Sequence, residues 1–407
     1  MLKLIRGITA EISGTGENAI YVDDAVSRLE KLCAERPGSV SLIYMDPPFM
    51  TGKKFEIKAM VGKDEWKSGK GTLVLPAYSD TLKTEDYLAL MRRVLCLSKQ
   101  LLAPDGLIVI HVDYRANAYI RLMADEIFGE DRFINEIIWA YESGGRSKYN
   151  FARKHDVILL YAASDAPDLH IDDVAEVQRG ERKIHMARGV DEDGRTYRHM
   201  TVGGKTYRYY DDEPVPPSDV WTDVSHLQQR DPQRTGFETQ KPLKLLERIV
   251  KCASREGDTV LDPFFGSGTS LEAAADYSRR FIGIDSNPLC SELARARAGE
   301  NACIIRPEND GAPLCEAERV EGITFASVYL EAFQIEEGLL PFEAGGLDAV
   351  NGWAVGTVKN GVFYEIASET RSRKEPALKG EIRVPINETG LCLRISDVLG
   401  RRFFYEL

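Results

Sequence analysis

Short apolar runs and amphipathic stretches alternate through the first part of the chain. Residues 19–22 (AIYV) and 39–45 (SVSLIYM) are apolar runs of strand length, and residues 25–35 (AVSRLEKLCAE) between them have the spacing of a helix that buries one face. Strand, helix and strand in this order predict the βαβ unit of a parallel sheet. The second run leads directly into Asp46, so we expect this residue at the carboxyl edge of the sheet.

The following segment continues this pattern with one interruption. Residues 53–76 are rich in Lys and Gly without a clear period, and they predict a mobile loop. A helix is predicted to begin at Thr84 as its N-cap. Residues 107–113 (LIVIHVD) predict a buried strand, and residues 136–141 and 155–162 predict two more strands that flank a basic, Gly-containing loop.

Residues 163–221 follow neither the strand period nor the helix period and are rich in charge and in Tyr. Their basic residues are Arg179, Arg182, Lys183, Arg188, Arg195, Arg198, Lys205 and Arg208. The acids between them, Glu181, Asp191, Glu192 and Asp193, leave a positive surplus. This composition suits contacts with phosphates and base edges of nucleic acid. The alternative interpretation is a solvated, charged loop region.

Alternation of strands and helices resumes after this segment. The predicted elements are a helix at 242–256, a strand at 259–263, a Gly-rich loop at 265–270, a helix at 271–278, a strand at 281–285 and a helix at 288–299. Such an arrangement is typical of a nucleotide-binding half of an α/β domain. Beyond Pro307, short alternating runs separated by turns such as KNG and NETG predict a small β-rich C-terminal domain.

Composition narrows the class of protein. The chain has 407 residues, too many for one ordinary compact domain. Its seven Cys contain no CxxC pair and its six His are dispersed, so we predict no disulfide framework and assign no metal. No apolar run approaches the roughly 20 residues of a membrane helix and the N-terminal residues lack a secretory signal, which predicts a cytoplasmic protein without membrane contact. The net charge of -12 argues against non-specific coating of nucleic acid but is compatible with a local basic cleft.

The tetrapeptide Asp46-Pro47-Pro48-Phe49 is the first candidate for chemistry. Two consecutive prolines fix the backbone and leave their carbonyls free as acceptors. Asp46 and the Pro47 carbonyl can accept the two hydrogens of an exocyclic amino group, while Phe49 stacks on the face of a base. A base held in this way must first be flipped out of the duplex. The alternative interpretation is a structural Asp-Pro turn.

The segment VLDPFFGSGTS, residues 260–270, is the second candidate. Gly266 and Gly268 allow a tight turn and a close approach of the backbone to a ligand, and Thr269 or Ser270 can start the next helix. A Walker loop would need a Lys before the Ser or Thr, and this segment has none. Asp285 follows at the end of the next strand, where an acid commonly binds a ribose diol.

These motifs resemble those of amino-group DNA methyltransferases. Asp46 to Phe49, Asp262 to Thr269 and the preceding TGFETQKPLKLLERIV look like the catalytic, cofactor and N-terminal cofactor-helix motifs of that family. The catalytic motif comes first, which is the order of the β class, to which type III modification subunits and many solitary enzymes belong. The segments YSD at 78–80, APDGLIVIHVD at 103–113 and KHDVILLYA at 154–162 also resemble this class, so the likeness runs from Ile20 to Ala302.

The resemblance implies an α/β fold: a circularly permuted Rossmann-like sheet that binds S-adenosylmethionine, with a target-recognition insert and a small β-rich C-terminal domain. The expected divisions are a catalytic half at 1–162, the target-recognition insert at 163–230, a cofactor-binding half at 231–305 and a C-terminal domain of unassigned role at 306–407.

Residue by residue, the resemblance implies that Asp46 and Pro47 hold the target amino group and that Phe49 stacks on the base, with Pro48 completing the motif. Thr239, Gln240 and Lys241 would reach the amino-acid end of the cofactor, and Asp285 its ribose hydroxyls. The full cofactor set is Thr239, Gln240, Lys241, Asp262, Pro263, Phe264, Gly266, Ser267, Gly268, Thr269, Asp285 and Asn287. Phe49 departs from the adenine-specific form of the motif, which usually has Tyr there.

The predicted function is methylation of N6 of a flipped adenine in double-stranded DNA, with S-adenosylmethionine as methyl donor. N4-cytosine methylation is the nearest alternative, and Asp rather than Ser at position 46 favours adenine. An RNA or protein methyltransferase and a non-catalytic DNA-binding or assembly subunit are further alternatives, against which the motif order and the intact motifs argue. Besides DNA, a homodimer partner and a separate restriction subunit stay open.

Overall fold

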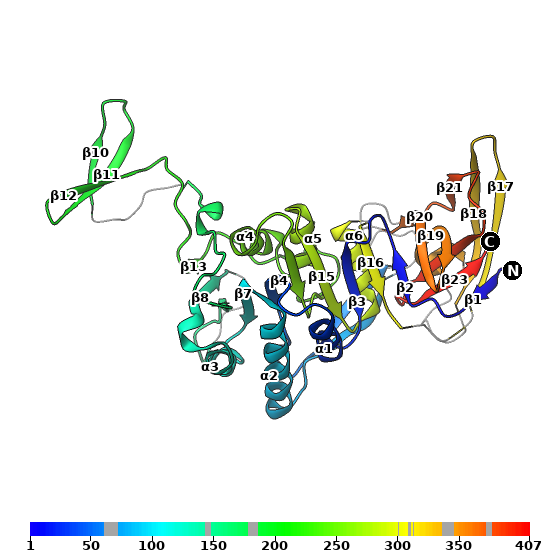
Figure 1. Ribbon diagram of the computed structural model, residues 1–407, viewed down its shortest axis with the longest axis horizontal. Helices are drawn as coiled ribbons and strands as arrows, with labels where there is room; N and C mark the ends of the chain where they lie inside the picture. The colour runs from blue at the N-terminus through cyan, green and yellow to red at the C-terminus, as the bar shows by residue number, and fades with distance from the viewer. Residues whose placement is uncertain are drawn as a thin grey trace.

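Alternating strands and helices build a three-layer core in the computed structural model, with an arm on one side and a β-rich region on the other (Figure 1). The structure describes residues 1–60, 72–142, 148–177, 186–299, 301–307, 311, 313–335, 346–371 and 377–407.

The centre of the molecule is a parallel sheet. Its neighbouring strands, in spatial order, are β16 (Ala302–Ile305), β3 (Asn18–Val22), β15 (Arg280–Asp285), β14 (Thr259–Asp262), β4 (Val40–Met45) and β7 (Leu102–Val112). Two strands, β9 (His155–Ala162) and β8 (Phe133–Ala140), continue the sheet in antiparallel pairings. The sheet thus combines strands from both halves of the chain, as expected for the Rossmann-like methyltransferase fold with permuted order.

Helices cover both faces of this sheet. On one face lie α1 (Ala25–Glu35), α2 (Thr84–Leu101) and α3 (Asn117–Phe128), and on the other α4 (Leu243–Ala253), α5 (Thr269–Asp276) and α6 (Pro288–Ala298). Alternation along β4 explains the two faces, because Leu42 and Tyr44 pack with α4–α6 while Ile43 and Met45 pack with α1–α3. No helix in the described part of the chain is long and apolar enough to cross a membrane.

The elements predicted around the two motifs are confirmed, with two differences in the catalytic half. The helix α2 begins at Thr84, but its N-cap is Lys83, so Thr84 is not the capping residue. The predicted loop at 53–76 was wrong at both ends, where β5 (Lys54–Met60) and β6 (Thr72–Ser79) form an antiparallel hairpin. Alternation around the buried Ile57 is the signal that the Lys-rich composition masked. Residues 61–71 lie outside the described residues.

The insert contains strands that the sequence pattern did not predict. Three antiparallel strands, β10 (Ala187–Val190), β11 (Thr196–Val202) and β12 (Lys205–Tyr210), form the arm in Figure 1. The turn between β11 and β12 is Gly203-Gly204, both with positive φ, which is a hairpin signal present in the sequence. The chain then returns to the core as β13 (Val220–Trp221), which pairs with β8. Short 3₁₀ helices occur at η2 (Glu130–Arg132), η3 (Ile171–Val174) and η4 (Gly346–Ala349).

The β-rich C-terminal region extends the central sheet. Strands β19 (Val350–Lys359), β20 (Val362–Thr370), β22 (Leu391–Asp397) and β23 (Arg402–Glu406) join it together with β1 (Lys3–Ile5) and β2 (Ala10–Ile12). A smaller sheet is formed by β17 (Leu314–Glu321), β18 (Phe325–Gln334) and β21 (Glu381–Pro385). Because β2 pairs with both β16 and β20, it connects the two regions; the division at residue 306 stays a prediction.

A buried network of charges ties this region to the core. The Arg402 Nε donates to Glu292 Oε1 on α6 over 2.6 Å, and its Nη1 donates to Glu11 on β2. The side chains of Arg402, Glu11 and Glu292 are 0%, 6% and 6% exposed. Burial opposes ionisation of Glu292, but the Arg402 guanidinium beside it lowers the pKa of the carboxyl to about 2. The network therefore fixes strands β2 and β23 against α6.

We predict that Arg402→Met strongly destabilises the protein, because it leaves two buried carboxylates without their shared partner. Loss of one member of a buried ion pair costs about 3–5 kcal/mol. Chemical denaturation followed by circular dichroism measures the change. Lys3→Met, which removes the exposed Lys3–Glu406 pair, is the matched control and should change stability little. Equal effects of the two substitutions would contradict a structural role for the network.

Candidate active site

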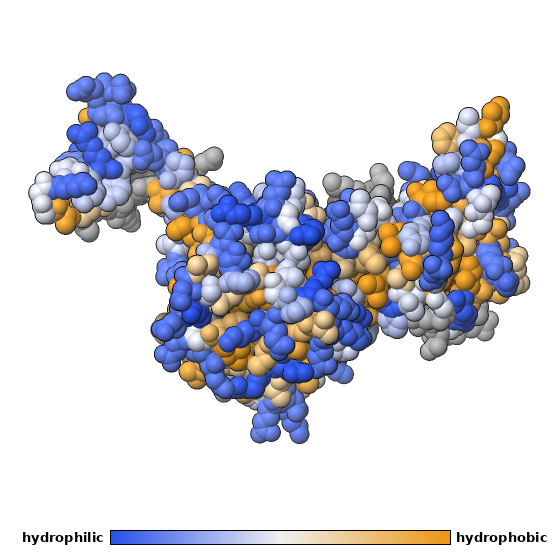
Figure 2. Space-filling model, viewed as in Figure 1, coloured by the Kyte–Doolittle hydropathy of each residue, from blue (hydrophilic) through white to orange (hydrophobic). Residues whose placement is uncertain are grey.

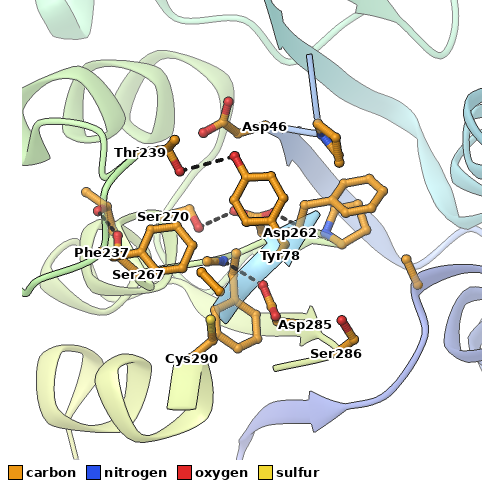
Figure 3. Close-up of a pocket in the computed structure, with 18 of the residues that line it drawn as sticks. Asp46, Tyr78, Phe237, Thr239, Asp262, Ser267, Ser270, Asp285, Ser286 and Cys290 are labelled. Carbon is orange, nitrogen blue, oxygen red and sulfur yellow. Dashed lines mark hydrogen bonds between the residues drawn. The ribbon is translucent and has the colours of Figure 1, made fainter. Parts of the chain in front are cut away.

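Three acidic residues meet at one edge of the central sheet. Asp262 and Asp285 end the adjacent parallel strands β14 and β15, and Asp46 follows β4, the other neighbour of β14. They line a cavity of about 420 Å³, seen in Figure 3 with residues from both halves of the chain. This volume lies within the range of roughly 300–1,000 Å³ for small-molecule sites.

Most residues predicted from the sequence line this cavity. They are Asp46, Pro48, Thr239, Lys241, Asp262, Pro263, Phe264, Gly266, Ser267, Thr269 and Asp285. Five do not: Pro47, Phe49, Gln240, Gly268 and Asn287. The sheet topology thus brings together two motifs that lie more than 200 residues apart in the chain, since Asp46 and Asp262 follow strands that pair directly.

The turn that carries Asp46 to Phe49 is held by Asp80. The backbone N–H groups of Phe49, Met50 and Thr51 donate to its carboxylate over 3.1, 2.9 and 2.9 Å. The Thr51 hydroxyl donates to the same carboxylate over 2.7 Å. Asp80 is 1% exposed, and Met50 has a positive φ of 56° that this arrangement stabilises. The segment YSD therefore has a structural role in the site, which its resemblance alone did not specify.

The Phe49 ring packs against a group of buried, hydrogen-bonded polar side chains. Its ring stacks on His111, with centroids 6.1 Å apart and an interplanar angle of 27°. His111 also contacts the Tyr44 hydroxyl over 3.1 Å and an Asp156 carboxylate oxygen over 3.2 Å. Burial opposes ionisation of Asp156, but its hydrogen bonds to His111 and Tyr141 and nearby positive charge lower its pKa. These contacts fix the orientation of the Phe49 ring.

The conformation and packing of the Gly-rich loop explain why positions 266 and 268 are glycine. Gly266 and Gly268 have φ of +50° and +78°. A Cβ at Gly268 would lie 2.7 Å from Ala294 Cα, and one at Gly266 would lie 3.0 Å from the Phe237 ring. The loop therefore packs directly on α6 and on the segment before α4, as close helix–strand packing requires.

The two acids of the cofactor half are each held by the loop. Asp262 accepts from the Phe264 N–H over 2.9 Å and from the Ser270 hydroxyl, and Asp285 accepts from the Gly266 N–H over 3.0 Å. Burial raises the pKa of Asp262 to about 7 and also raises the pKa of Asp285. Each carboxylate retains lone pairs for further donors.

Gln240 and Asn287 do not line the cavity; their side chains hydrogen-bond to the segments around it. The Gln240 amide accepts from Thr235 N–H over 2.8 Å and donates to the Gln233 carbonyl over 2.7 Å. Asn287 caps α6 through its Oδ1 and donates to the Ala77 carbonyl over 2.8 Å. Their side-chain polar groups make these contacts within the protein, and the cofactor contacts expected from the sequence stay a prediction.

Lys241 contacts the Asp46–Phe49 segment. Its ammonium donates to Asp46 Oδ2 over 2.5 Å and lies 5.1 Å from the centroid of the Phe49 ring. The side chains of Lys241 and Asp46 are 11% and 19% exposed. Lys241 also lines the cavity, so its expected place at the amino-acid end of the cofactor stays a prediction.

An aromatic wall is the part of the site that the sequence analysis missed. Tyr78 on β6 stacks with Phe55 and with Phe237, with centroid distances of 4.9 and 6.2 Å. Its hydroxyl donates to Thr239 over 3.4 Å, as Figure 3 shows. Tyr78 and Phe237 stand in segments already singled out by the resemblance, but their stacking depends on the β5–β6 hairpin, which was predicted as a loop.

Comparison with known proteins agrees with this geometry. A model of the N6/N4 methyltransferase family, described as DNA methylase, matches residues 40–295. The chain belongs to this family. The methylase is 28% identical over 324 residues to the type II methyltransferase M.EcaI of Enterobacter cloacae, covering 68% of each chain. It is 26% identical to the DNA adenine methyltransferase YhdJ of Escherichia coli, covering 67% of this chain and 80% of the relative.

Among solved structures, the methylase is similar to the protein TTHA0409 of Thermus thermophilus in complex with S-adenosyl-L-methionine. The two chains are 21% identical with a TM-score of 0.42, covering 72% of this chain and 100% of the other.

S-adenosylmethionine is the cofactor of this methylase family, and the cavity residues fit it. Asp285 offers a carboxylate at a strand end for the ribose diol, and Asp262 offers a second one for a cationic or hydroxyl donor. Phe264, Phe237 and Tyr78 supply ring faces for a purine.

We predict that Asp80→Ala lowers methylation by at least about 100-fold, because misplacement of a catalytic group by about 1 Å can cost that factor. Cofactor affinity should change less than about threefold, since Asp80 does not line the cavity. Methyl transfer assays and isothermal titration calorimetry measure the two quantities. Asp86→Ala, at an exposed position in the first turn of α2, is the control. Equal loss of cofactor binding would show that Asp80 supports the whole cavity instead of the turn.

Proposed function

We propose that the methylase transfers the methyl group of S-adenosylmethionine to N6 of an adenine flipped out of duplex DNA. The observation that carries this proposal is the position of Asp46, at the cavity wall beside the cofactor loop. Its carboxylate and the Pro47 carbonyl are the acceptors for the two amino hydrogens. The relative YhdJ, named as a DNA adenine methyltransferase, supports adenine as the base.

In this mechanism the protein supplies positioning and polarisation. S-adenosylmethionine supplies a methyl group that an amine attacks directly, so no covalent enzyme intermediate is needed. Asp46 and Pro47 draw the lone pair of the amino nitrogen out of ring conjugation, and Phe49, fixed by His111, stacks on the base. Asp262, Asp285 and Thr239 hold the cofactor side of the cavity.

A loop beside the catalytic turn suits the DNA backbone. Strand β9 runs antiparallel to β7, so the chain before it reaches the same sheet edge as Asp46. In this loop Tyr149 and Phe151 are 97% and 98% exposed, and Arg153 lies 3.8 Å from the centroid of the Tyr114 ring. Exposed aromatic and basic side chains together are typical of surfaces that hold bases and phosphates.

The arm is the proposed target-recognition element, and its basic residues are not equivalent. Figure 2 shows that its visible face is mainly hydrophilic. Arg195 pairs with Asp212 over 2.7 Å, and Arg188 and Arg198 each lie 3.6 Å from Asp211. These acids reduce the positive surplus expected from the sequence. Arg179, Arg182 and Lys183 lie outside the described residues.

Lys205 and Arg208 on β12 lie over the rings of Tyr207 and Tyr197, at 5.2 and 4.8 Å from the centroids. Their strand is exposed over most of its length. They are therefore the described basic residues of the arm best suited to neutralise phosphates.

N4-cytosine methylation is the alternative, and Phe49 in place of the Tyr usual in the adenine form is the observation that favours it. Any restriction activity would reside in a separate subunit.

We predict that expression in a methylation-free host yields N6-methyladenine at one sequence, detected by long-read mapping and by chromatography of DNA nucleosides. Asp46→Ala should abolish this product while leaving the dissociation constant of S-adenosylmethionine within about twofold, since its role is to bind the amino group. N4-methylcytosine as the product would overturn the assignment of the base. Parallel loss of cofactor binding in Asp46→Ala would overturn the division of roles.

We predict that the double substitution Lys205→Gln/Arg208→Gln weakens binding to duplex DNA and lowers the slope of log K against log salt by about 2, because each phosphate contact contributes about 0.9. Fluorescence anisotropy at several salt concentrations measures both. Arg195→Gln, at a position already paired with acids, is the matched control and should change the slope less. An unchanged slope in the double variant would place the phosphate contacts elsewhere.

A further inference from the structure

Lys241 makes the two contacts that the proposed function assigns to the target base. Its ammonium donates to Asp46 Oδ2 over 2.5 Å, where the target amino group should donate. It also lies 5.1 Å from the centroid of Phe49, the ring on which the base should stack. Lys241 and Asp46 come from opposite halves of the chain and both line the cavity.

The Lys241 ammonium and the target amino group compete for Asp46 Oδ2 and for the space over the Phe49 ring. The ammonium carries a full positive charge and the amino hydrogens of a base carry a partial one, so the two donors repel each other when both approach the same carboxylate oxygen. Space over the Phe49 ring is limited as well, because the ring already contacts His111. A base whose amino group donates to Asp46 Oδ2 therefore displaces the Lys241 ammonium from that oxygen.

We propose that Lys241 is a place-holder for the target amino group, displaced when the base enters. This inference rests on the proposed function. An exocyclic amino group replaces the lost hydrogen bond, because it donates to Asp46 itself. A base without an amino group at that position leaves a carboxylate that is only 19% exposed without its donor, which is unfavourable. Displacement of Lys241 is therefore less unfavourable for a base with an amino group at that position than for a base without one.

Contacts on the outer side of α4 offer a matched control. Lys244, three residues further along, is 51% exposed and lies 3.4 Å from Asp223 and 3.8 Å from Glu176. It does not line the cavity. Lys244→Met therefore removes the same charge from the same helix region without touching Asp46.

The test uses a duplex with the mapped site and 2-aminopurine at the target position, because this base is fluorescent when unstacked and lacks the amino group at C6. With wild-type protein we expect a small fluorescence increase. Lys241→Met should enlarge it by at least about fivefold, since the competing charged hydrogen bond is gone. Lys241→Arg, which keeps the donor, should restore the small increase, and Lys244→Met should behave as wild type.

A double-mutant cycle with Asp46→Asn shows whether Lys241 acts through Asp46. In the Asp46→Asn background, Lys241→Met should add little to the fluorescence. A reduced signal in Lys241→Met would show that Lys241 assists the base instead of holding its place, and would overturn the inference. So would weaker S-adenosylmethionine binding with unchanged fluorescence, which would mark Lys241 as a cofactor ligand. Failure of wild-type protein to methylate any site would contradict the proposed function itself.

Discussion

Four donors of one short turn converge on the carboxylate of Asp80, and the geometry of the catalytic motif depends on this contact. Three are backbone N–H groups, and Asp80 supplies each of them with a hydrogen-bond acceptor. Asp80 stands at the end of β6, so the hairpin that carries it also sets the position of Asp46. The same hairpin contacts the cofactor half, through Lys58 N–H to the Gly236 carbonyl over 3.2 Å and through Asn287 to Ala77. One hairpin therefore couples the two halves of the site.

The sequence predicted the central fold and most of the site because both depend on local patterns with long-range consequences. Asp46 follows one strand of the parallel sheet and Asp262 and Asp285 end two others, and these strand ends meet at one edge. The positive φ of Gly266 and Gly268 likewise agrees with what two glycines after a strand indicate.

Features that depend on tertiary partners could not be predicted in the same way. Lys241 stands beside the cofactor motif in the sequence, but its long side chain reaches Asp46 across the cavity, 195 residues away. Gln240 is a polar residue in a binding motif whose amide is occupied by Thr235 and Gln233. Spacing gives the position of such side chains, whereas the direction in which they point depends on the neighbours that fold around them.

The network around Arg402 has a consequence for the order of folding. Glu11 meets Arg402 across 391 residues of chain, so this contact closes one of the longest loops in the molecule. Closing such a loop has an entropic cost that is recovered only when its partners are in place. Strand β2 lies between β16 and β20. This N-terminal strand can therefore complete its pairings only after strands from the C-terminal part of the chain have formed. Assembly of the cavity can thus precede completion of the sheet, and the outer strands should be the last to gain protection from hydrogen exchange.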